Sequence, residues 1–220
     1  MNKLEKQKKF IKILNLVRKE VKNYDVPVIT MIANNKGKPF KILISTVLSL
    51  RTRDKTTLKA TNNLFKKIKT PEDILRLGEK KLSKLIYPVG FYNTKSKNII
   101  KICNILINKH NSKVPKSMGE LLKLPNVGRK TANIVLTLGF NIIDGIAIDT
   151  HCHRIPNRLG IINTKTPEET EKAIMKILPK KYWDKFNDNF VAFGQGKCKP
   201  LNPDCNDCVL RKMCEYGKEK

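Results

Sequence analysis

The chain has 220 residues, in which 45 lysines and arginines oppose 19 acidic residues for a formal net charge of +26. Forty per cent hydrophobic residues exclude a wholly disordered chain, and no apolar run approaches the ~18 residues of a membrane-spanning helix. The charge favours a polyanionic partner, DNA or RNA first, although a general enrichment in lysine, asparagine and isoleucine without function would give the same excess.

The N-terminal half of the chain has the periodicity of helices. Residues 4–22 place apolar side chains among lysines at a 3.6-residue period. Pro39 precedes a mostly apolar segment, 40–50, which predicts a buried helix, and Asp54 opens a further helix that continues to Ile68.

Three later helices are predicted from their starting residues. Thr70 and Thr166 each supply a capping hydroxyl followed by proline and acidic residues, and Ser117 with Glu120 predicts a capping box. No hairpin turn lies between alternating apolar runs, and the only short β-branched stretch, Ile142 to Ile148, is interrupted by Asp144-Gly145. We therefore expect an all-α fold. We expect core packing, not base stacking, from an aromatic stripe at helical spacing: Trp183, Phe186, Phe190 and Phe193.

The last 23 residues lose this periodicity and contain four cysteines in the spacing C-x6-C-x2-C-x5-C: Cys198, Cys205, Cys208 and Cys214. The charged start of the chain lacks a signal peptide's apolar stretch, so we expect a cytoplasmic protein in which disulfides are disfavoured. One CxxC flanked by single cysteines suits a cubane iron–sulfur cluster, and structural zinc stays open as the alternative. Cys103 and Cys152 stand apart, and we expect them to be buried as small hydrophobic residues.

The segment from Leu121 to Ala132 predicts a helix–hairpin–helix. A capped helix ends near Leu124, a Pro-Asn-Val-Gly turn follows, and a second helix begins. Backbone N–H groups at such a helix start hold a phosphate without reading base sequence. A P-loop is excluded, because Arg129 separates Gly128 from Lys130. An ordinary helical hairpin remains the simpler interpretation.

Lys130 lies in the first turn of this second helix. The helix dipole and the neighbouring Arg129 both disfavour a cation there, so the neutral, nucleophilic amine should be enriched. Asp149 follows the apolar run 146–148 nineteen residues later. Its position predicts an N-cap, and a capping carboxylate is ionised and rigid enough to face a developing cation as well.

Taken together, these motifs resemble the endonuclease III family. The resemblance runs from about residue 30 to the end and rests on the hairpin with its lysine, the Asp149-Thr150-His151 segment with Arg154 and Asn157-Arg158, the terminal cysteines, and the segments Ser49 to Asp54 and Gly90 to Lys95. It implies two helical lobes with DNA bound between them: 32–142, a barrel containing the helix–hairpin–helix, and 1–31 plus 143–220, with the cluster loop at 198–214.

The resemblance also implies roles for individual residues. Lys130 matches the catalytic nucleophile, Asp149 the catalytic carboxylate, and the four cysteines the ligands of a 4Fe–4S cluster. DNA contacts are implied for the hairpin and for two further loops: Arg51, Phe91, Pro125, Asn126, Val127, Gly128 and Arg129. Asn126 departs from the family's usual glycine but tolerates a left-handed conformation. Arg51 departs from a common glutamine, and Phe91 matches an apolar wedge that is often leucine.

By resemblance, the expected function is base excision repair by a bifunctional DNA glycosylase and abasic-site lyase. It would act as a monomer on damaged double-stranded DNA and remove oxidised pyrimidines such as thymine glycol through a lysine Schiff base. A sister glycosylase for 8-oxoguanine or for mismatched thymine or uracil, a non-catalytic DNA-binding protein, and an electron carrier are the alternatives.

Overall fold

The computed structural model describes residues 2–35 and 37–218, and the regular elements within these ranges are helices without any β-strand. The protein is therefore all-α, as predicted. The segment 142–148 runs as irregular chain, with Ile146, Ala147 and Ile148 buried. None of the described helices combines the length and the hydrophobicity that crossing a bilayer requires.

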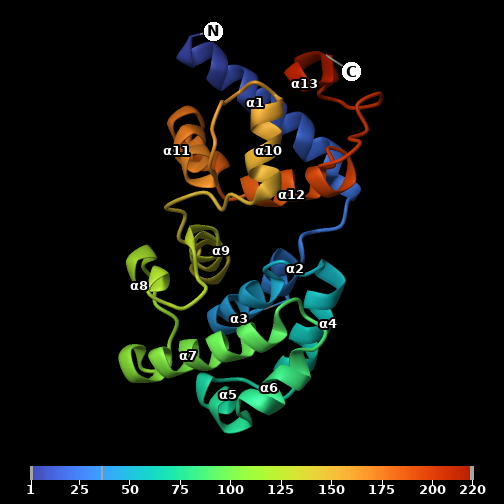
Figure 1. Ribbon diagram of the computed structural model, residues 1–220. Coiled ribbons are helices and arrows are strands. Elements are labelled where there is room, and N and C mark those ends of the chain that lie inside the picture. Colours follow the sequence, from blue (N-terminus) through green and yellow to red (C-terminus); the bar gives the residue numbers. More distant parts are fainter. Residues whose placement is uncertain (1, 36, 219–220) are drawn as a thin grey trace. The chain divides into compact units, whose positions relative to one another are not determined.

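The helices form two compact units (Figure 1). One comprises Val28–Ile142, and the other joins Met1–Pro27 to Ile143–Lys220. The first contains α2 (Val28–Asn34), α3 (Pro39–Ser49), α4 (Asp54–Phe65), α5 (Pro71–Leu77), α6 (Glu79–Ile86), α7 (Tyr92–His110), α8 (Met118–Leu122) and α9 (Arg129–Phe140). The second contains α1 (Lys3–Glu20), α10 (Thr150–Arg158), α11 (Pro167–Ile177), α12 (Phe186–Gly196) and α13 (Glu215–Lys218), with short 3₁₀ turns at Val21–Asn23, Lys180–Tyr182 and Arg211–Met213.

Helix α3 is the central element of the unit Val28–Ile142. It contacts α2, α4, α7 and α9, and its residues from Phe40 to Leu48 are almost all buried. This explains why the segment is apolar on all sides, because a helix surrounded by other helices has no solvent face. The buried helix predicted at 40–50 is confirmed.

The other unit is built around aromatic side chains. Phe10 of α1 meets the Phe186 ring edge-on at 6.0 Å between centroids, and Phe186 stacks on Phe190 at 4.5 Å. Phe186, Phe190 and Phe193 are buried, and Trp183 packs against the same cluster. The prediction that this aromatic stripe forms core is confirmed.

The helix starts follow the predicted caps with one exception. Thr70 and Asp73 form a capping box, and Thr166 accepts a hydrogen bond from the Glu169 backbone. Ser117 accepts from the backbone N–H of Glu120 at 3.3 Å, but the Glu120 carboxylate turns to Lys123 Nζ at 2.6 Å and does not close the box. The predicted capping box at Ser117 was therefore wrong, because the Glu120 carboxylate that would complete it forms an ion pair with Lys123.

Candidate functional site

The hairpin between α8 and α9 is fixed by apolar side chains at regular intervals. Leu121, Leu124 and Val127 are buried. Of the residues between them, Leu122, Lys123 and Asn126 are exposed and Pro125 is half-buried. Val127 therefore serves packing, and its backbone N–H donates to the Leu124 carbonyl at 3.2 Å. Asn126 has φ of +62°, so the departure from glycine leaves the left-handed turn in place.

The start of α9 offers backbone donors to an anion. Gly128 is the N-cap residue and supplies no side-chain hydrogen bond to the first turn of the helix. An added Cβ at Gly128 would meet no atom within 4 Å. The fold itself therefore has room for a larger residue at this position. The small size of glycine leaves the helix N-terminus open to a close ligand. Arg129 is exposed and Lys130 half-buried in this first turn.

Asp149 caps the N-terminus of α10. Its Oδ1 accepts from the backbone N–H groups of His151 at 2.9 Å and Cys152 at 2.8 Å. The predicted N-cap is confirmed. Two backbone donors on one oxygen hold the carboxylate in a fixed orientation, and the residue is half-buried.

Arg51 and Phe91 lie next to each other although forty residues separate them. The Arg51 guanidinium sits over the Phe91 ring at 4.6 Å from the centroid. Both residues have positive φ, +53° and +57°, and the Phe91 side chain is 55% exposed. Two predicted DNA contacts therefore form one exposed pair.

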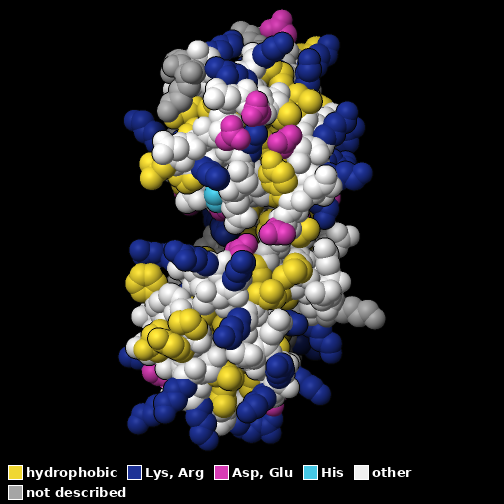
Figure 2. Space-filling view, turned by 90° about the vertical axis from the view of Figure 1, so that its right-hand side faces the viewer, with side chains coloured by type: hydrophobic (Ala, Val, Ile, Leu, Met, Phe, Trp, Pro, Cys, Tyr) yellow, Lys and Arg dark blue, Asp and Glu magenta, His cyan; other side chains and the backbone are white. Residues whose placement is uncertain are grey.

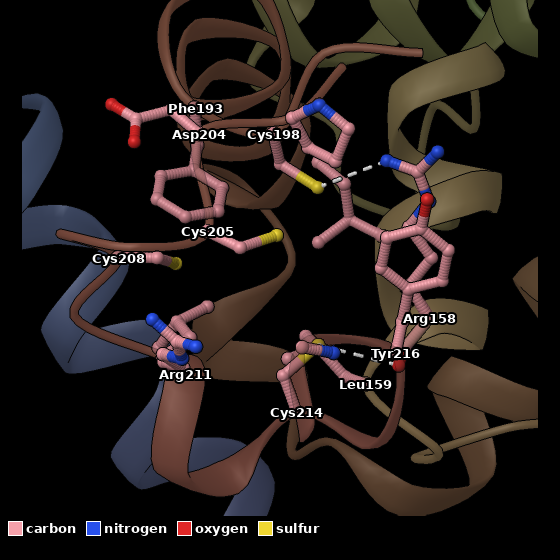
Figure 3. A pocket seen from close by; sticks show the side chains of 14 residues that line it. Arg158, Leu159, Phe193, Cys198, Asp204, Cys205, Cys208, Arg211, Cys214 and Tyr216 are labelled. Carbon is pink, nitrogen blue, oxygen red and sulfur yellow. Dashed lines mark hydrogen bonds between the residues drawn. The ribbon is translucent and has the colours of Figure 1, made fainter. Parts of the chain in front are cut away.

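The four C-terminal cysteines line a single pocket (Figure 3). Cys198 follows α12, and the other three lie on the loop that leads to α13. Apolar side chains close the pocket floor, among them Ile155, Leu159, Phe193 and Leu210. The four cysteines therefore lie around one pocket.

The surroundings of these sulfurs suit thiolate ligands. Arg158 Nη1 donates to Cys198 Sγ at 3.5 Å, and the Gly217 backbone N–H donates to Cys214 Sγ at 3.4 Å. Burial raises the pKa of the Cys208 and Cys214 thiols, and the neighbouring cysteines raise it further. Four thiolates in one pocket therefore need a bound cation to balance their charge.

Two kinds of metal centre are commonly held by four cysteines, structural zinc and a cubane iron–sulfur cluster. Within the described part of the chain, no three His, Cys, Asp or Glu side chains converge closely enough to hold a single metal ion. A tetrahedral zinc site needs all four sulfurs at about 2.3 Å from one point. A cubane takes one thiolate at each of its four iron corners, so four cysteines that line one pocket could supply its ligands.

The cationic side chains near the cysteines differ in their availability. Lys197 pairs with Asp204 at 2.8 Å, and Arg211 donates to Asn206 Oδ1 at 3.0 Å. Lys199 and Lys212 are exposed. On the face that Figure 2 shows, lysines and arginines are spread over both units.

Sequence reasoning gave no role to Arg158. In addition to its bond to Cys198, Arg158 donates to the carbonyls of Lys199 and Pro200, both at 2.8 Å, and stacks on Tyr216 at 4.5 Å. It therefore braces both ends of the cysteine loop. Its forty-residue separation from that loop hides this role, although the arginine belongs to a motif of the resemblance. Lys130 and Asp149 belong to different units, and each is placed within its own.

Comparison with known proteins agrees with this architecture. Residues 44–180 match the HhH-GPD superfamily of base excision DNA repair proteins. Endonuclease III of Thermotoga maritima is 49% identical over 83% of this chain and 85% of its own length. The structure of a non-covalent endonuclease III–DNA complex superposes with a TM-score of 0.88 at 36% identity over 97% of both chains. A trapped endonuclease III–DNA covalent intermediate superposes with a TM-score of 0.79 at 40% identity over 83% of this chain and 85% of that one.

The matched helices and hairpin define the class as a helix–hairpin–helix DNA glycosylase of base excision repair. Within this class the chain belongs to the endonuclease III family. It is therefore an enzyme of the DNA glycosylase and abasic-site lyase class.

Proposed function

We propose that the protein removes oxidised pyrimidines from double-stranded DNA and cuts the resulting abasic site through a covalent bond to Lys130. The observation that carries this proposal is the position of Lys130, in the first turn of α9 directly after the left-handed turn at Asn126 and the open N-cap at Gly128. A phosphate held at that helix start would bring the sugar of the damaged nucleotide to the amine.

The chemistry begins with a nucleotide extruded from the stack. The neutral amine of Lys130 bonds to C1′ while the glycosidic bond breaks and the base departs with its electron pair. The nitrogen then loses a proton, O4′ takes up a proton as the C1′–O4′ bond breaks and the sugar ring opens, and a protonated Schiff base remains. Loss of a proton from C2′ expels the 3′ phosphate oxygen, which breaks the strand by β-elimination.

Asp149 would assist in two ways. We propose that Oδ2 faces the sugar, because Oδ1 carries both capping bonds. An ionised carboxylate stabilises the positive charge that develops on the sugar. It can also accept the proton that the lysine nitrogen loses and return it to O4′ as the ring opens.

We infer that the cysteine pocket holds a 4Fe–4S cluster bound by Cys198, Cys205, Cys208 and Cys214. When bound, the cluster supplies four iron–thiolate bonds that tie the C-terminal loop to one centre. The bond from Arg158 to Cys198 Sγ and the bond from the Gly217 N–H to Cys214 Sγ would stabilise two of the thiolates. Lys199 and Lys212 would then be presented to phosphates.

We propose DNA contacts at Arg51, Phe91 and the hairpin residues Pro125, Asn126, Gly128 and Arg129, with Val127 contributing by packing. The named structural relatives are complexes with DNA, and one is a covalent intermediate, which supports both partner and mechanism. We further propose that the enzyme acts as a monomer in the cytoplasm, and that the division into lobes follows the two units.

A panel of duplexes tests the lesion class. Each duplex carries one lesion: thymine glycol, 8-oxoguanine, a thymine or uracil mismatch, or an abasic site. Strand cleavage fastest at thymine glycol and the abasic site supports the proposal. Cleavage fastest at 8-oxoguanine or at the mismatches assigns the enzyme to a sister specificity, and tight DNA binding without any cleavage identifies a non-catalytic clamp.

A further inference from the structure

Lys95 is a buried cation that makes its hydrogen bonds with neutral groups. It lies in the first turn of α7 and is 3% exposed. Its ammonium donates to the carbonyl of Leu48 at 2.8 Å, to the carbonyl of Leu50, and to Thr52 Oγ1 at 3.0 Å. An ammonium has three hydrogens, and these three acceptors use all of them.

The three acceptors belong to the end of α3 and the loop that follows. The last carbonyls of a helix have no partner within the helix and form the negative end of its dipole. Helix α3 ends at Ser49 with Leu50 as its C-cap residue. Lys95 therefore caps α3 from a helix more than forty residues later and fixes how residues 50–52 leave it.

Thr52 connects the loop after α3 to a second loop, the one that precedes α7. Its hydroxyl accepts from Lys95 and also from the Gly90 backbone N–H at 3.1 Å. An added Cβ on Gly90 would lie 2.6 Å from the Arg51 carbonyl oxygen. The loop before α7 and the loop after α3 are therefore joined at van der Waals contact around one buried ammonium.

Each of these joined loops carries one member of the exposed pair. Arg51 and Phe91 both occupy the left-handed region, which is unfavourable for residues with a side chain and persists where the surroundings fix it. Lys95 also bonds through its own backbone N–H to the Phe91 carbonyl at 2.9 Å. Arg51 therefore lies between two residues that accept from the Lys95 ammonium, and Phe91 accepts from the Lys95 backbone.

We propose that Lys95 is a positioning residue whose ammonium locks the two loops together, so that Arg51 and Phe91 project as one rigid wedge into the base stack when a damaged nucleotide is extruded. This proposal rests on the proposed function. A rigid wedge lowers the entropy lost on insertion, since two preformed side chains fill the vacated space together. Burial lowers the pKa of Lys95 to about 8, so at neutral pH most molecules carry the protonated ammonium.

The test compares Lys95→Met with Lys101→Met. The methionine keeps the length and apolar stem of Lys95 and removes its charge. Lys101 is exposed on the same helix, so its variant loses the same charge and leaves the hydrogen bonds of Lys95 in place. Each protein is assayed on an abasic site in duplex DNA, where a wedge is needed, and on the same site in single-stranded DNA, where no stack has to be opened.

The proposal predicts that Lys95→Met cuts the duplex about tenfold more slowly, equivalent to about 1.4 kcal/mol, and cuts the single strand at the wild-type rate. Lys101→Met should match the wild type on both. The fluorescence of 2-aminopurine placed opposite the abasic site reports the opened stack directly, and its rise on binding should be smaller with Lys95→Met. Thr52→Val, which removes the link to Gly90, should show the same pattern and decides the question if Lys95→Met does not fold.

An equal loss on duplex and single strand by a folded variant, or a normal 2-aminopurine signal, would overturn the positioning role. A wild-type enzyme that cuts neither substrate would instead refute the proposed function.

Discussion

Asp149 combines a structural and a chemical task at one carboxylate, and substitution separates the two. Asparagine caps a helix about as well as aspartate, whereas alanine loses about 1 kcal/mol. Asp149→Asn should therefore melt close to the wild type and Asp149→Ala several degrees lower, while both lose abasic-site cleavage. Thermal unfolding and single-turnover cleavage are the measurements. If Asp149→Asn cleaved at the wild-type rate, Asp149 would have no chemical role and would serve only as the N-cap of α10.

Lys95 predicts a pH dependence of stability with a definite sign. Its pKa falls from 10.5 in the unfolded chain to about 8 in the folded protein, because burial penalises the charge. Between these values the unfolded state binds more protons, so the free energy of unfolding contributed by this group rises with pH from about 8 to about 10.5 and is flat below. The difference in unfolding free energy between the wild type and Lys95→Met should follow that course in denaturant titrations. A difference independent of pH over this range would contradict the assignment.

Among single elements, the hairpin allows the cleanest test of phosphate binding. Gly128→Ala places a methyl group where the fold has open space, so it should cause no clash. Alanine is a poorer N-cap than glycine, so we expect a small loss of stability, and the methyl would narrow the approach to the helix N-terminus. We expect weaker binding to undamaged and abasic duplexes alike. Gly119→Ala on α8, where an added Cβ also meets nothing, is the matched control. Unchanged affinity in Gly128→Ala would mean that no phosphate approaches this helix start.

The cysteine loop is a second element with its own prediction. Cys208→Ser should lose the yellow-brown absorbance and the iron of a 4Fe–4S cluster, whereas Cys103→Ala, at a buried thiol outside the pocket, should retain both. Loss of the cluster should weaken DNA binding more than it slows cleavage once DNA is saturating, because Lys199 and Lys212 depend on the loop's conformation. Retention of zinc and not iron by the purified wild type would contradict the ligand assignment.

Elements formed by contacts between residues that are near in the sequence could be predicted, whereas those formed by contacts between distant residues could not. The caps at Thr70, Thr166 and Asp149 are hydrogen bonds to residues two or three positions later in the chain. The local sequence was therefore sufficient to predict them. The left-handed turn at Asn126 was likewise local. The capping box at Ser117 failed because Lys123 competes for Glu120. Lys95 could not be singled out, because its burial depends on carbonyls at the end of α3 more than forty residues earlier. Pattern alone does not distinguish one lysine among so many.

For the whole molecule, the charge of +26 predicts that DNA binding weakens as the salt concentration rises. Phosphate contacts release counterions, so the logarithm of the affinity should fall linearly with the logarithm of salt concentration, for undamaged and damaged duplexes with similar slopes. Titrations by fluorescence anisotropy from about 50 to about 200 mM salt measure this. An affinity that hardly changed over this range would indicate that the basic surface plays no part in binding.

The central claim, that Lys130 forms the covalent bond to DNA, is tested most directly by borohydride trapping on abasic duplex. Reduction of the Schiff base should convert the wild type and Lys123→Gln, a control at an exposed lysine of the same hairpin, into stable protein–DNA adducts. Lys130→Gln should bind the duplex and give no adduct. An adduct with Lys130→Gln, or none with a wild type that binds and cuts the site, would contradict the account.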